Sequence, residues 1–202
     1  MKKLLLATTN KGKIGEYRYL FRGLPFEIVS PMQENIDIDV DEKFMTMEDN
    51  ARQKALDYAE RSGIITVADD SGLEVDALGG EPGVRSSRYA GEGASDEDRV
   101  NYLLSKLEGV PPGKRTARFR CVIAIADKSG IRAICNGECN GTIAFEPKGE
   151  NGFGYDPIFF LQELNKTLAE LNTETKNNLS HRANAAREAR PILSRLAEEI
   201  TQ

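Results

Sequence analysis

Apolar residues recur along the chain in two different rhythms, and the rhythm predicts the type of each element. Short runs that are wholly apolar, or that alternate with polar residues, indicate strands, because side chains in a strand point alternately to opposite faces. Apolar residues spaced three or four apart indicate helices, because such positions share one helical face. The predicted strands cover 3–8, 26–31, 64–68, 115–126, 131–137 and 141–147, and the predicted helices cover 13–22, 47–61, 95–109 and 180–200.

Local signals mark several of the helix ends. Thr46 is an N-cap residue with Asp49 three positions on, and Ser95 precedes a helix whose first turn is acidic. Gly109 follows that helix, where glycine readily takes the left-handed conformation. Pro191 falls inside the last helical pattern, and we expect it to kink or break that helix because proline lacks the amide hydrogen.

The order of the elements predicts the fold class. Strands alternate with helices in the first part of the chain, and three consecutive strands follow between residues 115 and 147. The first arrangement is typical of parallel strands and the second of an antiparallel meander. We therefore expect an α/β fold with a long mixed β-sheet flanked by helices, in a single domain of residues 1–202. Within it we expect two lobes with a central active-site cleft, where the polar, glycine-rich segments converge.

Composition limits the class of partner. The chain has 202 residues, with 27 Lys and Arg against 32 Asp and Glu, and a net charge of −5. Proteins that bind nucleic acid usually carry a basic excess, so we expect no nucleic-acid partner, although a few local cations can still hold a small phosphorylated ligand. The N-terminal MKKLLLATTN resembles the start of a signal peptide, but its apolar run stops at Ala7, and no stretch has transmembrane length. The expectation is a cytoplasmic protein with no membrane partner.

The cysteines do not indicate a disulfide framework or a metal site. Cys121, Cys135 and Cys139 are sparse and odd in number. The last two are spaced like a metal clip, but the one histidine, His181, lies far along the chain, so a zinc site would lack ligands. We expect strand cysteines in a reducing cytosol.

TTNKGK, at residues 8–13, is a candidate anion-binding segment. It lies between a predicted strand and a predicted helix, where free amide hydrogens and the helix dipole suit an anion. Lys11 and Lys13 add positive charge, and Gly12 allows close approach of the backbone. The segment is not a Walker A loop, because the first glycine, the spacing and the Ser or Thr after Lys are absent. A strand–helix turn with solvated lysines is the simpler interpretation of so short a match.

An acidic segment before the second predicted helix is a candidate metal site. Asp39, Asp41 and Glu42 lie there, and Asn50 and Lys54 follow one turn apart on the helix. Mg²⁺ prefers one or two protein carboxylates together with water and phosphate oxygens. The alternative is a solvated acidic loop next to a charged helix face.

ADDSG, at residues 68–72, places two carboxylates at the exit of a buried strand. Because side chains alternate along a strand, Asp69 and Asp70 should point in opposite directions, so only one should face a strand-end site. A carboxylate there can hold Mg²⁺ or accept a proton from water, and Ser71 can donate to a phosphate. The alternative is an Asp-Ser-Gly turn that opens a glycine-rich loop extending to about residue 91.

Two further segments combine aromatic and charged residues. GENGFGYDP places Phe153 and Tyr155 among glycines, where a planar ring can stack, although a hairpin loop whose aromatic side chains fill the core is a serious alternative. KNNLSHR places Ser180 as a helix cap, with His181 and Arg182 in the first turn. Cations oppose the helix dipole at that end, so their presence indicates a nearby anion or acceptor.

In this order, these segments resemble the inosine triphosphate pyrophosphatase family. The matching pieces are ATTNKGK, DE…TMEDNARQKA, ADDSGLEVDALGGEPGVRSSRYAG, RTARFRC, NGFGYDPIF, and KTLAEL…K followed by SHR. The resemblance implies an enzyme that cleaves nucleoside triphosphates between the α and β phosphates and releases a monophosphate and pyrophosphate. It implies ITP, dITP and XTP as the preferred small-molecule substrates, Mg²⁺ as the cofactor, and a homodimer. The chain departs from the usual pattern at Met47, where Phe is common, at the missing glycine before Thr46, and at SHRA in place of SHRG.

The resemblance also implies roles for individual residues. Asp70 would be the general base and a metal ligand, with Glu42 and Asp41 near the metal. The triphosphate would be bound by Thr8, Thr9, Asn10, Lys11, Gly12 and Lys13, with Ser71 beside it. The base would be bound by Phe153, Gly154, Tyr155, Asp156, Lys176, His181 and Arg182. A donor such as His181 or Arg182 would donate to the 6-oxo group of the purine. Adenine lacks this acceptor and would leave the donor unpaired, so such a site can discriminate strongly against adenine nucleotides.

Other function classes remain open on the sequence alone. A related pyrophosphatase acting on pyrimidine or modified nucleotides would differ only in substrate preference. A non-catalytic nucleotide-binding module would bind ITP without turnover, although the intact DDSG and lysine segment argue against it. Aspartyl-phosphate chemistry is a weaker alternative, because DDSG lacks the usual spacing of two aspartates around one residue.

Overall fold

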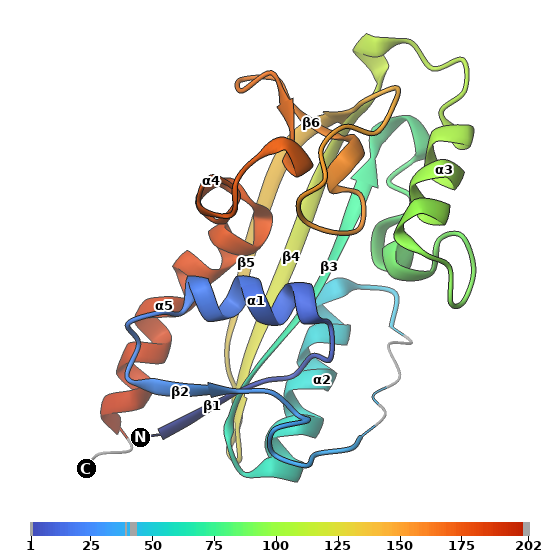
Figure 1. The fold of residues 1–202 in the computed structure, drawn as a ribbon. Coiled ribbons are helices and arrows are strands. Elements are labelled where there is room, and N and C mark those ends of the chain that lie inside the picture. The colour runs from blue at the N-terminus through green and yellow to red at the C-terminus, as the bar shows by residue number, and fades with distance from the viewer. Residues whose placement is uncertain (1, 39, 41–43, 200–202) are drawn as a thin grey trace. The chain divides into compact units, whose positions relative to one another are not determined.

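The computed structural model describes residues 2–38, 40 and 44–199 (Figure 1). Its helices are α1 (Lys11–Leu20), α2 (Met47–Ser62), α3 (Asp96–Lys106), α4 (Thr173–Leu179) and α5 (His181–Glu199). Its strands are β1 (Lys2–Leu6), β2 (Phe26–Val29), β3 (Ile65–Val75), β4 (Thr116–Asp127), β5 (Gly130–Ile143), β6 (Phe159–Leu161) and β7 (Lys166–Thr167). Short 3₁₀ segments are η1 (Asp76–Leu78), η2 (Gly83–Arg88), η3 (Pro112–Lys114), η4 (Asp156–Ile158) and η5 (Leu168–Glu170).

The described strands form one mixed sheet, in the order β2-β1-β3-β4-β5-β6-β7. β1 pairs in parallel with β2 and β3, so that Leu4 lies opposite Ile28 on one side and Ile65 on the other. β6 runs antiparallel to both β5 and β7. The predicted α/β class, with a mixed sheet flanked by helices, is therefore confirmed. None of the described helices has the length and apolar composition needed to cross a membrane.

Two compact units divide the chain. Unit 1 comprises Met1–Asp70, Cys121–Gly137 and Arg182–Gln202, and unit 2 comprises Ser71–Arg120 and Glu138–His181. Each has its own hydrophobic core. In unit 1, apolar residues of β1, β3 and β4 pack with Tyr17 of α1, with its C-cap residue Phe21 and with the alanine-rich face of α5. In unit 2, Leu103 of α3 packs in a cluster that includes Phe119 and Phe159.

The N-caps predicted at Thr46 and Ser95 are confirmed, but α3 ends at Lys106 with Leu107 as its C-cap, earlier than the predicted end at Gly109. The first helix begins earlier than predicted. The Thr46 side chain accepts from the Asp49 amide, and Ser95 forms a capping box with Asp98. α1 begins at Lys11 rather than at residue 13, because Asn10 caps it by accepting a hydrogen bond from the Lys13 amide at 3.1 Å. The anion-binding segment therefore includes the first helical turn.

Two strand predictions were wrong. β3 does not end at residue 68 but continues through the adjacent aspartates to Val75, so neither the predicted strand exit nor the Asp-Ser-Gly turn is present. β5 is one strand over 130–143, where two strands at 131–137 and 141–147 were predicted. Glycine within it permits close pairing with β6, because a Cβ on Gly141 would lie 2.7 Å from the Phe160 carbonyl oxygen.

Pro191 does not break the last helix. α5 continues from His181 to Glu199 with the proline inside it. Ala185, Ala189 and Leu193 from the same helix are fully buried in the core of unit 1. This packing stabilises the helix on both sides of the proline, where local propensity alone would favour an end.

The three cysteines supply a test of the fold. All are free and lie in strands, β4 and β5, as predicted, and all three are buried. Burial raises the pKa of the Cys121 thiol to about 12 and the pKa of Cys135 and of Cys139 to about 11. Because the thiolate is the nucleophile, we expect no rapidly reacting thiol with an aromatic disulfide reagent at about pH 8 in the folded protein, and three after unfolding in guanidinium. A thiol that reacts within seconds in the folded protein would contradict the described packing.

Candidate active site

The adjacent aspartates of β3 contact different helices of unit 1. Asp69 Oδ2 lies 2.9 Å from Lys13 Nζ of α1 and 3.5 Å from Arg182 Nε of α5. Asp70 Oδ2 instead accepts a hydrogen bond of 3.0 Å from Asn50 Nδ2 of α2. The prediction that the two carboxylates point in opposite directions is confirmed. It follows that α1 and α5 lie on one face of β3, and α2 on the other.

Asp69 is part of a buried cluster of opposite charges. Arg182 also forms an ion pair with Glu16 Oε2 at 3.1 Å, and the Asp69 side chain is only 1% exposed. Burial alone would raise the pKa of Asp69, but the charges of Lys13 and Arg182 outweigh it and lower the pKa to about 2. Burial would lower the pKa of Arg182, but Glu16 and Asp69 hold that pKa above its usual range. Asp69 is therefore ionised and its charge is compensated by the two cations.

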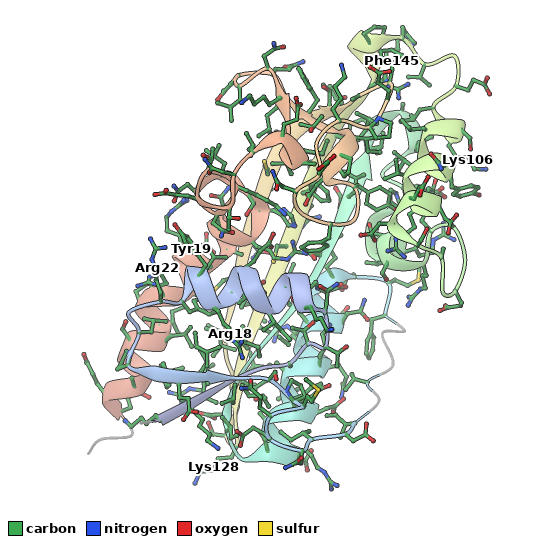
Figure 2. The ribbon with its side chains drawn as sticks, viewed as in Figure 1. Arg18, Tyr19, Arg22, Lys106, Lys128 and Phe145 are labelled. Atoms are coloured by element: carbon green, nitrogen blue, oxygen red, sulfur yellow. The ribbon has the colours of Figure 1, made fainter. Side chains whose placement is uncertain are left out.

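Two exposed cations, one on α1 and one just after it, do not belong to this cluster. Arg18 and Arg22 are exposed, and the Arg22 guanidinium lies 3.8 Å from the centre of the Tyr19 ring (Figure 2). Lys13, on the inward side of the same helix, is only 15% exposed. Arg18 donates to Gln33 Oε1 at 2.8 Å, so of these three cations only Lys13 pairs with Asp69.

The predicted triphosphate segment lies at the start of α1. Thr8, Thr9 and Asn10 connect β1 to the helix, and Lys11, Gly12 and Lys13 form its first turn. Three of these residues also have structural contacts: Thr8 Oγ1 accepts a hydrogen bond of 3.2 Å from the Asn10 amide, Asn10 caps the helix, and Lys13 pairs with Asp69. A lysine ammonium has three donor hydrogens, so pairing with Asp69 does not use all of its capacity.

Asp70 is a buried carboxylate held by a fixed neutral amide. Its relative exposure is 6%, and that of Asn50 is 2%. Asn50 Oδ1 accepts from the Phe44 amide at 3.0 Å, and Nδ2 also donates to the Phe44 carbonyl at 3.2 Å. These two bonds set the orientation of the amide, so that its NH₂ group faces Asp70. Sequence reasoning placed Asn50 on this helix but gave it no role, because a contact with Asp70 requires the packing of α2 on β3.

The predicted metal ligands are described only in part. Asp41 and Glu42, together with Asp39, lie outside the described residues. Among the residues that the structure describes, no group of three or more His, Cys, Asp or Glu side chains is positioned to hold a metal ion. Asp70 supplies an oxygen donor of the kind that Mg²⁺ prefers, and one or two such carboxylates are sufficient when phosphate and water complete the coordination. Ser71, the next residue of β3, is half-buried and belongs to unit 2.

The second cluster of predicted site residues lies in unit 2. Asp156 and Lys176 form a buried ion pair with an oxygen–nitrogen distance of 2.6 Å. The same Asp156 oxygen accepts from the Phe153 amide at 2.9 Å, and Lys176 Nζ lies 4.9 Å from the centre of the Phe153 ring. Gly152 makes this arrangement possible, because a Cβ there would lie 2.1 Å from Asp156 Oδ2. The half-buried Phe153 ring and the lysine ammonium are therefore held together on a glycine-containing loop.

The aromatic residues of this region divide into two kinds. Tyr155 belongs to the core of unit 2, and its hydroxyl donates to the Ser86 carbonyl at 2.9 Å. Of the two interpretations of the aromatic pair, core filling thus holds for Tyr155, whereas Phe153 lies outside the core cluster. His181 begins α5, directly after Ser180 as predicted, and stacks on Phe119 with ring centres 4.7 Å apart.

Comparisons with known proteins agree with the resemblance. A family model described as the Ham1 family matches residues 4–192. A protein of Desulforamulus reducens named dITP/XTP pyrophosphatase is 51% identical over 96% of each chain. A protein of the same name from Geobacter sulfurreducens is 49% identical over 92% of this chain and 93% of its own.

Solved structures of Ham1 proteins have a fold similar to that of this chain. The Ham1 protein of Staphylococcus aureus has a TM-score of 0.85 and 41% identity, and covers 95% of this chain and 98% of its own. A HAM1 protein from Coxiella burnetii has a TM-score of 0.87 and 40% identity, and covers 96% of this chain and all of its own.

Acidification should weaken the fold through Asp69. Its pKa of about 2 lies below the ordinary 3.8, so the ionised form contributes stability that is complete above about pH 4 and is lost as the pH falls toward 2. The difference corresponds to about 2 kcal/mol in the free energy of unfolding. Asp69→Asn should remove this part of the pH dependence and should destabilise the protein by about 3–5 kcal/mol at neutral pH, because it breaks a buried pair. Urea unfolding between about pH 2 and pH 7 measures both effects, and a variant curve parallel to the parent curve would contradict the ion-pair account.

The loop glycines allow a matched test of the Asp156–Lys176 pair. Gly152 and Gly154 both have positive φ, 80° and 62°, but only a Cβ on Gly152 meets another atom within 4 Å. Both alanine variants should lose about 1–2 kcal/mol from backbone strain. Gly152→Ala should lose more, because its methyl group displaces Asp156 from the ion pair. Thermal unfolding of the two variants decides this, and equal losses would show that the close approach is unimportant.

Proposed function

The chain belongs to the Ham1 family, and from that membership we propose how its own residues hydrolyse a nucleoside triphosphate. The activity is that of a nucleoside triphosphate pyrophosphatase: dITP or XTP is cleaved to the monophosphate and pyrophosphate. The observation that carries the residue assignment is the placement of the two aspartates on opposite faces of β3. Asp69 is engaged by Lys13 and Arg182, whereas Asp70 is oriented by the neutral amide of Asn50. We therefore assign the catalytic role to Asp70 and a structural role to Asp69.

Asp70 acts as the general base in this proposal. It accepts a proton from the water that attacks phosphorus, while the Asn50 amide keeps the carboxylate in one orientation. Mg²⁺, when bound, supplies positive charge that neutralises the triphosphate and the departing pyrophosphate. Asp70 would hold it through a carboxylate oxygen, together with Glu42 and Asp41 as the resemblance implies.

The start of α1 is the proposed phosphate site. The amides of its first turn and the positive end of its dipole attract an anion. Lys11 is exposed there, and Lys13 is fixed by its ion pair with Asp69 while retaining donor hydrogens for a phosphate oxygen. Thr8, Thr9, Asn10, Gly12 and Ser71 complete the proposed phosphate-binding set.

The loop around Phe153 is the proposed base site. Phe153 offers a ring face for stacking, and Lys176 lies beside that ring in its ion pair with Asp156. His181 and Arg182, at the start of α5, are the proposed donors to a 6-oxo group, which adenine lacks. Tyr155 contributes indirectly, because its bond to Ser86 anchors the loop that carries Phe153 and Gly154.

Two further expectations from the resemblance are retained as proposals. We infer that the protein is a homodimer, and light scattering coupled to size-exclusion chromatography would report its mass directly. We also infer a cytoplasmic location, which agrees with the three buried free thiols.

Substrate choice tests the proposed function. Purified protein with Mg²⁺ should release pyrophosphate from ITP, dITP and XTP with a kcat/KM about 10²-fold or more above that for ATP. Equal values for ITP and ATP would contradict base selection, and binding of ITP without turnover would identify a nucleotide-binding module instead. Preference for a pyrimidine triphosphate would instead identify the related pyrophosphatase that acts on pyrimidine or modified nucleotides.

Asp70→Asn tests the catalytic assignment. Loss of a general base should lower kcat by about 10²–10⁴-fold with the substrate KM little changed. Glu60→Gln removes one exposed carboxylate from α2 and is the matched control, with an expected kcat close to that of the parent. An Asp70→Asn enzyme with full kcat would remove Asp70 from the mechanism.

A further inference from the structure

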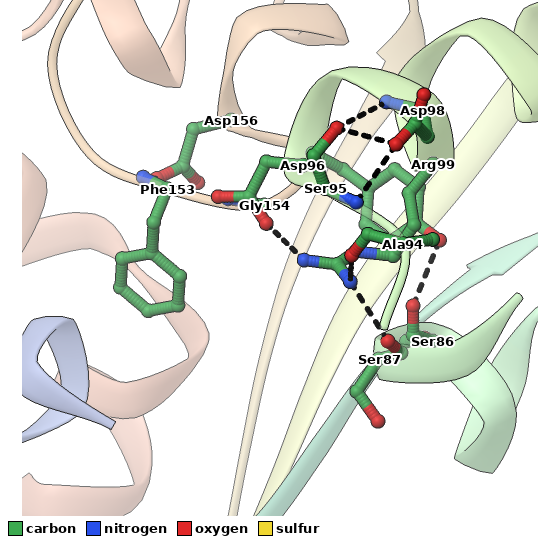
Figure 3. Close-up of polar contacts among 11 residues, drawn as sticks. Ser86, Ser87, Ala94, Ser95, Asp96, Asp98, Arg99, Phe153, Gly154 and Asp156 are labelled. Carbon is green, nitrogen blue, oxygen red and sulfur yellow. Dashed lines mark hydrogen bonds and ion pairs between the residues drawn. The ribbon is translucent and has the colours of Figure 1, made fainter. Parts of the chain in front are cut away.

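The loop that carries Phe153 is bound at a second point, by a residue of α3. The Gly154 amide donates to Asp96 Oδ2 at 2.7 Å, and Figure 3 shows the Asp96 carboxylate between Gly154 and the Arg99 guanidinium. Arg99 forms an ion pair with the other oxygen of Asp96. All of these residues belong to unit 2. One carboxylate thus connects the loop to the first turn of α3.

Arg99 is itself held by the backbone. Its Nη1 donates to the Ser87 carbonyl at 2.9 Å and to the Ala94 carbonyl at 2.6 Å (Figure 3). Its side chain is 17% exposed, although Asp96 is 47% exposed. The charge-assisted pair between a fixed guanidinium and Asp96 therefore restricts a carboxylate that would otherwise rotate in solvent.

Helix capping does not account for Asp96. The first turn of α3 contains three acids, Asp96, Glu97 and Asp98, and Asp98 alone completes the capping box with Ser95. All three interact favourably with the helix dipole in the same way. Asp96 differs from its neighbours in accepting the Gly154 amide.

We propose that Asp96 is a positioning residue that, through Gly154, holds the Phe153 ring in the geometry that receives the purine base. This inference rests on the proposed base site. Phe153 is fixed on one side by its amide bond to Asp156, and Gly154, the next residue, by Asp96. With both amides held, the ring stays beside Lys176, and less ordering is needed when a base stacks on it. Asp96 and Arg99 are not among the proposed catalytic or phosphate-binding residues, so the chemical step should not depend on them.

The experiment compares Asp96→Ala with Glu97→Ala. Both variants remove one negative charge from the same helical turn, but only the first removes the acceptor of the Gly154 amide. Asp96→Ala should raise the KM for ITP about tenfold with kcat within about twofold, because the loss falls on binding. Glu97→Ala should leave both constants within about twofold. Asp96→Asn keeps an acceptor for Gly154 and loses the charge, so its KM should lie between the two.

A second readout does not depend on the enzymatic function. Hydrogen–deuterium exchange of the peptide containing residues 151–156, measured without nucleotide, should be about tenfold faster in Asp96→Ala and unchanged in Glu97→Ala. Unchanged exchange in Asp96→Ala would overturn the positioning role even if the enzyme is active. Faster exchange with an unchanged KM for ITP would overturn the connection to base binding. If the parent protein had no activity on purine triphosphates, the proposed function would fail while the exchange result still decided whether Asp96 holds the loop.

Discussion

The ion pairs of Asp69 are the constraint on which unit 1 depends. A carboxylate buried in an apolar core is strongly unfavourable unless opposite charges compensate it. Asp69 lies on β3 among the apolar residues of the core, and Lys13 and Arg182 supply that compensation from α1 and α5. Both helices must therefore lie on one face of the strand, at a register that presents these cations. Strand alternation then places Asp70 on the opposite face, against α2.

Unit 2 uses the same physical principle at another position. Asp156 is buried with Lys176, and the glycine at 152 leaves the space that the carboxylate occupies. The loop from Gly152 to Asp156 contains two aromatic residues. Tyr155 packs in the core of unit 2, whereas Phe153 is half-buried beside Lys176. In both units, charged residues that the sequence predicts to bind a ligand form ion pairs with one another. The ligand sites that we propose include these ion pairs.

Much of this could be predicted from the sequence, and the exceptions have physical causes. The caps at Thr46 and Ser95 and the opposite directions of Asp69 and Asp70 depend on local geometry, which the sequence encodes directly. The extension of β3 through two aspartates was missed, because a polar pair predicts a turn unless its partners on other elements are known. Pro191 was expected to disrupt α5, but tertiary packing outweighed local propensity. Asp96 was interpreted as an ordinary first-turn acid, since its contact with Gly154 joins segments 58 positions apart.

The central claim is that two chemically identical neighbours have separate tasks, with Asp69 stabilising the fold and Asp70 performing the chemistry. The most direct test is to measure kcat and the free energy of unfolding for Asp70→Asn and Asp69→Asn side by side. The account predicts that Asp70→Asn retains the free energy of unfolding to within about 1 kcal/mol and loses at least about 10² in kcat, whereas Asp69→Asn loses several kcal/mol of stability. An Asp70→Asn protein that is as destabilised as Asp69→Asn, or that keeps its kcat, would contradict it.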